Sequence, residues 1–163
     1  MTVEEMLARE AIRYTISRYN SAVDRGAYDE FVDVFTPDGV MMFGETKRLE
    51  GLDSIIVSMS ANAKARNAYD PSYFQRHLLG NPIINVIDDK TARAVTYLVA
   101  FSELGLDHSG VYIDRFVKSG DRWLIAERVG HLEWGNPATR HKTTPPKPAS
   151  REALNLKFRA PGD

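Results

Sequence analysis

The four histidines of this chain are the side chains best suited to acid–base chemistry near neutral pH, because the pKa of an ordinary imidazole is about 6.5. They are His77, His108, His131 and His141. No two of them stand at a spacing typical of metal ligands, and the carboxylates show no ligand pattern either. The chain has no cysteine, which excludes thiolate nucleophiles, disulfides and thiolate metal sites. We therefore expect neither a catalytic metal nor a cofactor.

Asp24 has an unusual position for a carboxylate. A helix of about 22 residues is predicted from Thr2, which suits an N-cap, to Gly26, which suits a C-terminal stop. Asp24 falls in the last turn of this helix, where the negative end of the helix dipole disfavours another negative charge. Some partner should compensate for this placement, and Arg25 or the solvent at the helix end is the simplest candidate.

His77 stands near the start of a predicted long strand. Strand alternation places Gln75, His77 and Leu79 on one face, so His77 can point to the covered face only if it finds a polar partner there. A buried acid would be a natural partner. Tyr19 lies on the apolar stripe of the first helix, where its hydroxyl needs a partner as well. A structural histidine and a core tyrosine are the simpler interpretations of these two residues.

The elements that must position these residues are helices first and strands second. The predicted helices span residues 2–26, 27–35 and 51–66, and the predicted strands span 40–43, 74–87, 91–103, 109–118 and 122–130. The turn Thr36-Pro37-Asp38-Gly39 ends the second helix, and Gly80-Asn81-Pro82 interrupts the first long strand. This order predicts an α+β domain in which three N-terminal helices cover a curved, mostly antiparallel sheet.

Charge and proline content divide the chain near residue 135. The net charge is -1 overall, but the segment from Pro137 to Asp163 carries a net charge of +4 and leaves -5 on the rest. The same segment holds five of the eight prolines. We therefore predict one domain over residues 1–134 and a proline-rich basic arm over 135–163. Because the arm has no interleaved aromatic residues beyond Phe158, nucleic acid is not an expected partner.

Several further classes of protein are disfavoured by missing patterns. There is no run of about 18 apolar residues, and the N-terminus is acidic where a secretory signal needs positive charge. There is also no glycine-rich phosphate loop and no Gly-x-Ser-x-Gly elbow. We expect a cytoplasmic protein that does not contact a membrane.

Four stretches of the sequence together resemble the SnoaL-like branch of the nuclear transport factor 2-like superfamily. They are Arg18–Gly26, Phe35–Gly39, the Arg76-His77 pair before Gly80-Asn81-Pro82, and Gly110–Arg115 leading to Trp123–Ile125. The resemblance covers residues 4–134 and implies a cone of curved sheet closed by helices. It also implies a homo-oligomer, dimer or trimer, in which the arm clasps a neighbour or closes the cone.

The resemblance assigns roles to individual residues. Scytalone dehydratase, the hexachlorocyclohexane dehydrochlorinase and bile-acid dehydratases are similar to this chain in pairing an Asp at the end of the first helix with a His on the next long strand. Asp24 and His77 match this dyad, so His77 would be the general base and Asp24 would fix its tautomer. Tyr19 and Tyr112 match pocket residues that would donate a hydrogen bond, and Arg128 matches a basic residue that would hold an anionic or phenolic group.

A pocket of this kind also needs apolar walls, which we expect from Met42, Phe43, Phe101 and Trp134. Such walls favour a small, apolar, aromatic or polycyclic ligand. The predicted function is a cofactor-independent lyase or dehydratase that removes water, halide or a one-carbon aldehyde after proton abstraction. The alternatives are an isomerase or cyclase with the same dyad, or a non-catalytic small-molecule binding or assembly protein.

One departure from scytalone dehydratase concerns a second pocket histidine. The sequence does not place one on the strand over 91–103, where Tyr97, Val99 and Phe101 share one face and Leu98, Ala100 and Ser102 share the other. The substrate of scytalone dehydratase is therefore not carried over to this chain.

Overall fold

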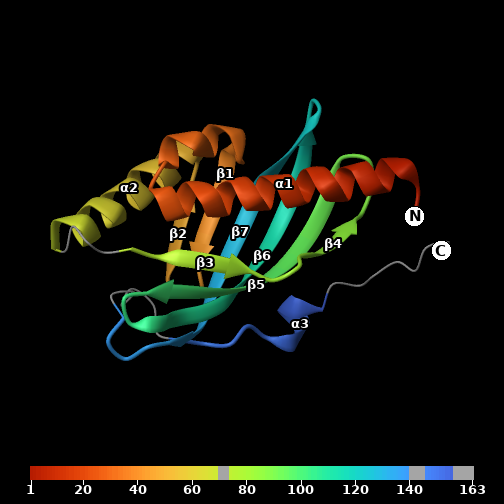
Figure 1. Ribbon diagram of the computed structural model, residues 1–163. Helices are drawn as coiled ribbons and strands as arrows, with labels where there is room; N and C mark the ends of the chain where they lie inside the picture. Colours follow the sequence, from red (N-terminus) through yellow and green to blue (C-terminus); the bar gives the residue numbers. More distant parts are fainter. Residues whose placement is uncertain (70–73, 140–145, 156–163) are drawn as a thin grey trace.

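The computed structural model describes residues 1–69, 74–139 and 146–155, and it contains one seven-stranded sheet with helices on both faces (Figure 1). The elements are α1 (Val3–Arg25), the 3₁₀ helix η1 (Tyr28–Asp33), β1 (Phe35–Phe43), β2 (Lys47–Glu50), α2 (Leu52–Tyr69), β3 (Arg76–Leu79), β4 (Ile83–Val86), β5 (Thr91–Ser102), β6 (Gly105–Ser119), β7 (Arg122–Gly135) and α3 (Arg151–Leu154). The predicted α+β class with its N-terminal helices is confirmed.

The helix α1 begins and ends where the sequence predicts. Thr2 Oγ1 accepts a hydrogen bond from the backbone N–H of Glu5 at 3.2 Å, and Gly26 adopts a left-handed φ of 71°, which glycine does without steric cost. The buried face of the helix consists of Ala8, Ile12, Thr15, Ile16, Tyr19 and Ala22. This face packs on the sheet, so the last turn of α1 reaches the strand β3 (Figure 1).

The strands follow the order β2-β1-β7-β6-β5-β3, and β4 also pairs with β5. β1 and β7 run parallel, while every other pair of described strands is antiparallel. The mostly antiparallel sheet is therefore confirmed. It curves around α1 and stays open between β2 and β3 (Figure 1).

The turn predicted at Thr36-Pro37-Asp38-Gly39 is instead an irregularity inside β1. Phe35 pairs with Ile125 and Val40 pairs with Glu127, so β1 contains more residues than β7 between these two pairs. Because Phe35 already pairs in the sheet, the second predicted helix is the short η1 only. The strand β2 and the helix α3 are further elements that the sequence analysis did not predict.

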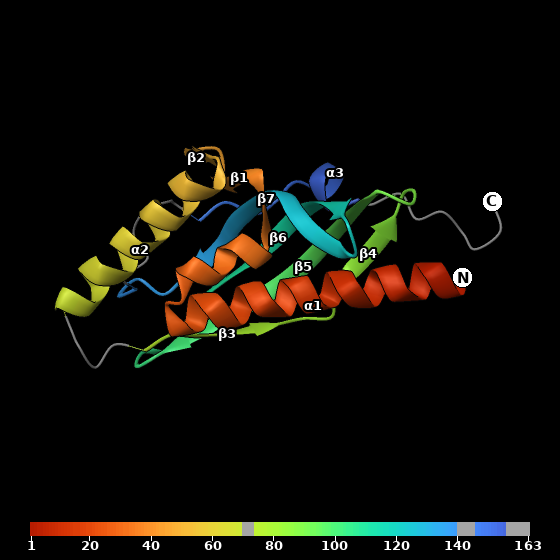
Figure 2. The ribbon, with the colours of Figure 1, turned by 90° about the horizontal axis from the view of Figure 1, so that it is seen from above.

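Two apolar clusters lie on opposite faces of the sheet. The inner face, defined here as the face toward α1, packs against α1, η1 and α2 in the larger cluster. On the outer face, Val95, Val111 and Ile113 form a smaller cluster. This smaller cluster is covered by Ala149, Ala153 and Leu154 of the arm, and Figure 2 shows α1 and α3 on opposite sides of the sheet. Part of the arm thus packs on its own domain.

The arm also makes polar contacts with the domain. Lys147 Nζ lies 2.9 Å from Glu45 Oε1, and the backbone N–H of Ala149 donates to Glu133 Oε1 at 3.2 Å. The arm residues Arg140, His141, Lys142, Lys157, Phe158 and Arg159 lie outside the described residues. Within the described residues, no helix has both the length and the low polarity that crossing a membrane requires.

Candidate active site

The strand register brings two histidines together on the inner face. His77 of β3 pairs with Ala100 of β5, and Ala100 pairs with His108 of β6. Paired residues on neighbouring strands point to the same face, so the two imidazoles rise on either side of a small alanine. Their ring centroids are 5.5 Å apart and the rings meet edge to face at 69°. His108 therefore brings a second histidine to the inner face beside His77, from β6 rather than from β5.

Asp24 and His77 form a close pair. Nδ1 of His77 lies 2.6 Å from Oδ1 of Asp24, and the backbone N–H of His77 donates to both carboxylate oxygens, at 3.1 and 3.3 Å. The two side chains are only 14% and 6% exposed, for Asp24 and His77 respectively. The carboxylate is thus fixed against the ring and the backbone of the same histidine.

The end of α1 and the strand β3 are joined by further hydrogen bonds. Asn20 Nδ2 donates to the carbonyl oxygen of His77 at 3.2 Å, and Arg76 Nη1 donates to the backbone oxygen of Asp24 at 3.3 Å. Arg25, the simplest predicted partner for Asp24, instead pairs with Glu30 at 2.8 Å. The carboxylate in the last turn of α1 is therefore compensated by β3.

A second pair, Asp107 and His108, was not predicted. Nδ1 of His108 lies 2.7 Å from Oδ2 of Asp107. Neighbouring residues of a regular strand point to opposite faces, but β6 is irregular here. Ala100 pairs with His108 whereas Phe101 pairs with Leu106, so Asp107 is an extra residue in β6. This bulge lets two consecutive side chains both be buried.

Three donors surround the carboxylate of Asp107. Besides His108, Ser102 Oγ donates to Oδ1 at 2.9 Å and Thr139 Oγ1 donates to Oδ2 at 2.7 Å. Burial acts to raise the pKa of Asp107, but the hydrogen bonds from His108, Thr139 and Ser102 outweigh it and hold the pKa below its ordinary value. Asp107 is therefore ionised at neutral pH and accepts the hydrogen on Nδ1 of His108.

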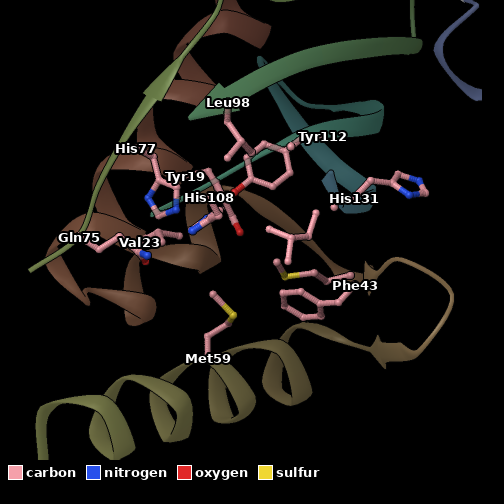
Figure 3. A pocket seen from close by; sticks show the side chains of 14 residues that line it. Tyr19, Val23, Phe43, Met59, Gln75, His77, Leu98, His108, Tyr112 and His131 are labelled. Carbon is pink, nitrogen blue, oxygen red and sulfur yellow. The ribbon is translucent and has the colours of Figure 1, made fainter. Parts of the chain in front are cut away.

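A cavity of about 110 Å³ opens beside the two pairs (Figure 3). It is lined by Tyr19, Val23, Met41, Phe43, Met59, Gln75, His77, Leu98, His108, Gly110, Tyr112, Gly130, His131 and Leu132. In Figure 3, His77 and His108 lie side by side, Phe43 and Met59 lie across the cavity from them, and the ring of His131 points away. Two imidazoles facing mostly apolar walls can move protons on a bound uncharged molecule.

Glycine occupies two positions of the cavity wall for different reasons. A Cβ at Gly110 would lie 2.1 Å from the backbone oxygen of His131, so the close approach of β6 and β7 requires glycine there. A Cβ at Gly130 would lie 3.4 Å from the ring of Tyr112, which is an ordinary contact. The missing side chain at Gly130 therefore leaves space beside Tyr112.

Arg128 does not line the cavity. Its Nε and Nη2 each donate to the carboxylate of Asp114 at 2.7 Å, and both side chains are 0% exposed. The guanidinium lies 3.9 Å from the ring centre of Tyr19 and 4.2 Å from that of Tyr112. The predicted contact of Arg128 with an anionic substrate does not fit this geometry, because the register pairs Arg128 directly with Asp114.

Burial acts on the pKa values of Tyr19, Tyr112 and Arg128. It raises the pKa of Tyr19 well above its ordinary value and also raises that of Tyr112. Burial acts to lower the pKa of Arg128, but the charge and hydrogen bonds of Asp114 outweigh it and raise that pKa. At neutral pH the two tyrosines are therefore neutral O–H donors with a neutralised ion pair next to their rings.

Of the predicted apolar walls, Phe43 lines the cavity and Met42 does not. Strand alternation places Met41 and Phe43 on the inner face, so Met41 lines the cavity in place of Met42. The sulfur of Met42 instead accepts from Arg48 Nη1 at 3.3 Å. A shift of one residue along β1 thus decides that Met41, and not Met42, lines the cavity.

Phe101 and Trp134 also lie outside the cavity wall and are 38% and 43% exposed. Phe101 alternates with the buried Ala100 of the inner face. Trp134 pairs with Ser109, whereas Leu132 pairs with the cavity-lining Gly110. Both aromatic residues therefore face away from the predicted pocket.

The residues that the sequence analysis missed are Asp107, His108 and Thr139 around the second pair. Their signal in the sequence is the Asp107-His108 dipeptide close to Gly105, which a strand bulge can turn to one face. Over residues 1–69, 74–139 and 146–155, no group of three or more His, Asp and Glu side chains is placed to hold a metal ion.

Comparisons with known proteins agree with this fold. Residues 4–129 match the model of the SnoaL-like domain family. An uncharacterized protein of Mycobacterium tuberculosis, strain H37Rv, is 28% identical over an alignment of 135 residues, and the match covers 79% of this chain and 88% of that protein. An uncharacterized protein of Mycobacterium bovis gives the same values.

Solved structures share the fold at low sequence identity. A protein of Novosphingobium aromaticivorans DSM 12444 named for scytalone dehydratase has a TM-score of 0.71 and 17% identity, over 83% of this chain and 91% of that chain. LinA has a TM-score of 0.69 and 14% identity, over 88% of this chain and 98% of that chain. A beta subunit named for an aromatic-ring-hydroxylating dioxygenase of the same Novosphingobium has a TM-score of 0.68 and 20% identity, over 83% and 95%.

Proposed function

Because this chain belongs to the SnoaL-like domain family, we propose that it is a cofactor-independent lyase in which His77 takes a proton from the substrate. The observation that carries the proposal is the 2.6 Å contact between His77 Nδ1 and Asp24 Oδ1 on the wall of an apolar cavity. The likeness to structures named for scytalone dehydratase and LinA supports the same class.

The first step is the transfer of a proton to His77. Asp24 accepts the hydrogen on Nδ1, so Nε2 of the neutral ring is the basic nitrogen, and the carboxylate stabilises the imidazolium as it forms. The proton comes from a carbon next to an electron-withdrawing group such as a carbonyl. General base catalysis of this kind contributes about 10² to 10⁴ in rate. Positioning by the cavity walls and hydrogen bonds to developing charge supply the rest.

The second step is the departure of the leaving group. The electrons of the broken C–H bond form a carbon–carbon double bond, and the leaving group departs with its own bonding pair. A leaving hydroxide takes a proton from the imidazolium of His108, which the ionised Asp107 stabilises. Tyr19 and Tyr112 are neutral donors that can hold the carbonyl oxygen as it gains charge. A leaving halide needs no proton.

The cavity walls favour an uncharged substrate. None of the described lining residues is Lys or Arg, and a carboxylate stands behind each of the two imidazoles. The volume of about 110 Å³ is smaller than the roughly 150 Å³ of an engineered cavity that holds benzene, so it limits the enclosed part of the ligand to about one small ring. We propose a ring compound that carries a carbonyl group and, two carbons away from it, a hydroxyl group or halide.

Deuterium exchange tests this function. Wild type, His77→Gln and Asp24→Asn would be incubated in D₂O with cyclic hydroxyketones, phenols and halides, and products would be followed by mass. The expected result is exchange and elimination by wild type that both variants lose while they stay folded. Asp29→Asn, the same change at an exposed carboxylate of η1, is the matched control and should keep full activity.

Other outcomes decide between the alternatives. Product of unchanged mass apart from exchanged deuterium would replace the lyase by an isomerase or cyclase. Ligands that bind by calorimetry without exchange or turnover would make this chain a small-molecule binding protein. In that case Asp24 and His77 would be a structural pair, and their replacement would lower stability without any catalytic effect.

A further inference from the structure

We propose that the C-terminal arm is a working part of the active site, because Thr139 positions His108 through Asp107. The catalytic part of this inference rests on the proposed function. Thr139 Oγ1 donates to Oδ2 of Asp107 at 2.7 Å, and the same oxygen lies 2.7 Å from Nδ1 of His108. Asp107 is 1% exposed and Thr139 is 7% exposed. One buried carboxylate oxygen thus joins a hydroxyl of the arm to an imidazole of the cavity wall.

The start of the arm is built around Asp107. The backbone N–H of Asn136 donates to the backbone oxygen of Asp107 at 2.7 Å. The N–H of Thr139 then donates to the backbone oxygen of Asn136 at 2.8 Å, and the N–H of Ala138 donates to Asn136 Oδ1 at 3.0 Å. Residues 136–139 therefore form a closed turn that meets Asp107 at both ends. This turn fixes the place of the Thr139 hydroxyl.

Asp107 needs such support because it is the extra residue of the bulge in β6. Ser102 Oγ occupies the oxygen Oδ1, so Oδ2 is the oxygen that serves His108. A buried carboxylate with too few donors takes up a proton, and it then no longer accepts the Nδ1 hydrogen of His108 in a fixed direction. The hydroxyl of Thr139 keeps this oxygen ionised and in place.

No described residue of the arm, over 135–139 and 146–155, hydrogen-bonds to the first pair. The carboxylate of Asp24 is held by the ring and the backbone N–H of His77, and both residues lie within the family-matched residues 4–129. Thr139 lies beyond that range. Thr139 thus supports the pair that faces the leaving group, whereas the base His77 is held by Asp24 of α1.

The test compares Thr139→Val, which removes the hydroxyl and keeps the shape, with Thr139→Ser, which keeps the hydroxyl. Thr15→Val is the matched control, because Thr15 is 6% exposed and donates to the backbone oxygen of Trp123 at 2.6 Å, away from the cavity wall. Three quantities are measured on the full chain. They are the imidazole ¹⁵N spectrum, the steady-state kinetics (kcat and KM) with a compound that wild type turns over in the deuterium-exchange experiment, and the unfolding temperature. The signals of His108 are assigned by their loss in His108→Gln.

We expect Thr139→Val to shift the His108 nitrogen signals away from a fixed hydrogen on Nδ1. It should lower kcat about tenfold, as the loss of one hydrogen bond to a charged group does, with KM changed less than about twofold. Thr139→Ser, which keeps the hydroxyl, should show the His108 nitrogen signals and the kcat of wild type. Thr15→Val should lower the unfolding temperature and leave the His108 signals and kcat as in wild type.

Two results would overturn the inference. One is an unchanged His108 spectrum in Thr139→Val, and the other is an equal loss of kcat in Thr139→Val and Thr15→Val. Failure of the proposed function looks different. If wild type turns over no compound, the lyase is rejected, while the nitrogen spectrum still decides whether Thr139 positions His108.

Discussion

Two acid–base pairs on the inner face of the sheet differ in what they border. Asp24 and His77 meet at 2.6 Å next to a cavity, with side chains 14% and 6% exposed. Asp114 and Arg128 meet at 2.7 Å with both side chains 0% exposed. The contact distances are nearly equal. Access to a bound molecule, rather than a short contact, therefore separates a pair that can do chemistry from one that cannot.

The difference follows from where the partners come from. Asp24 and His77 belong to a helix end and an edge strand, and the cavity lies between His77 and α2. Asp114 and Arg128 are direct neighbours across β6 and β7, and the ring of Tyr19 lies on the guanidinium. In addition, an imidazole can release its proton near neutral pH whereas a guanidinium cannot. The fully buried pair of Asp114 and Arg128, called the sealed pair below, contributes to stability and packs against the rings of Tyr19 and Tyr112.

The largest effect is expected from His77→Gln. Glutamine can still donate to Asp24, but it cannot take a proton, so kcat should fall about 10²- to 10⁴-fold. The unfolding temperature should change little, because the hydrogen bond to Asp24 is kept. Steady-state turnover and a thermal melt of the same preparation check this. An unchanged kcat would break the comparison, since both pairs would then be structural.

Arg128→Met should have the next largest effect, and it acts on stability. It leaves the carboxylate of Asp114 buried without its partner, and breaking a buried pair in this way costs about 3–5 kcal/mol of unfolding free energy. Urea unfolding measures the loss. Adding Asp114→Leu should recover most of it, because an apolar pair of similar volume replaces a buried ion pair at little cost. A loss below about 1 kcal/mol would show that water reaches this pair.

Much of this arrangement could be predicted from the sequence. The caps at Thr2 and Gly26 and the apolar stripe between them locate α1 and hence Asp24 in its last turn. The change from a period near 3.6 to a period near 2 locates the strands, and the family resemblance adds His77. The predicted oligomer and the predicted cytoplasmic location stay predictions.

The remaining parts depend on irregularities that periodicity does not reveal. A one-residue bulge turns Asp107 inward beside His108, and a shift of one residue exchanges the two faces of a strand. The same reasoning explains Met42, which is one residue away from the cavity-lining Met41 and Phe43. Trp134 follows a similar irregularity, because Glu133 is an extra residue of β7 between the pairs Gly110–Leu132 and Ser109–Trp134. The partner of Arg128 depends on the register of β6 against β7, which only the structure gives.

Acid should weaken the support that Asp107 gives to His108, and this extends the comparison to the Asp107–His108 pair. The pKa of Asp107 is lowered in the folded protein, so the ionised carboxylate adds stability above the ordinary carboxyl pKa of about 3.9 and loses it as pH falls through the lower folded value. Asp107→Asn should therefore cost about 1–3 kcal/mol at pH 7. The difference from wild type should shrink below about pH 4. Urea unfolding at several pH values measures it, and a constant difference would contradict the assignment.

Gly130→Ala should have the smallest effect, and it probes the space that distinguishes the first pair from the sealed one. The added Cβ would lie 3.4 Å from the ring of Tyr112, so the methyl group fits and stability should change by less than about 1 kcal/mol. It also fills part of the cavity, so the KM of a ring substrate should rise by up to about tenfold. Gly110→Ala is the contrasting variant, because its Cβ would lie 2.1 Å from the backbone oxygen of His131 and must displace β7. If Gly130→Ala left KM unchanged for substrates of every size, the ligand would not occupy the space beside Tyr112, and His77 would have to act on a molecule bound elsewhere in the cavity.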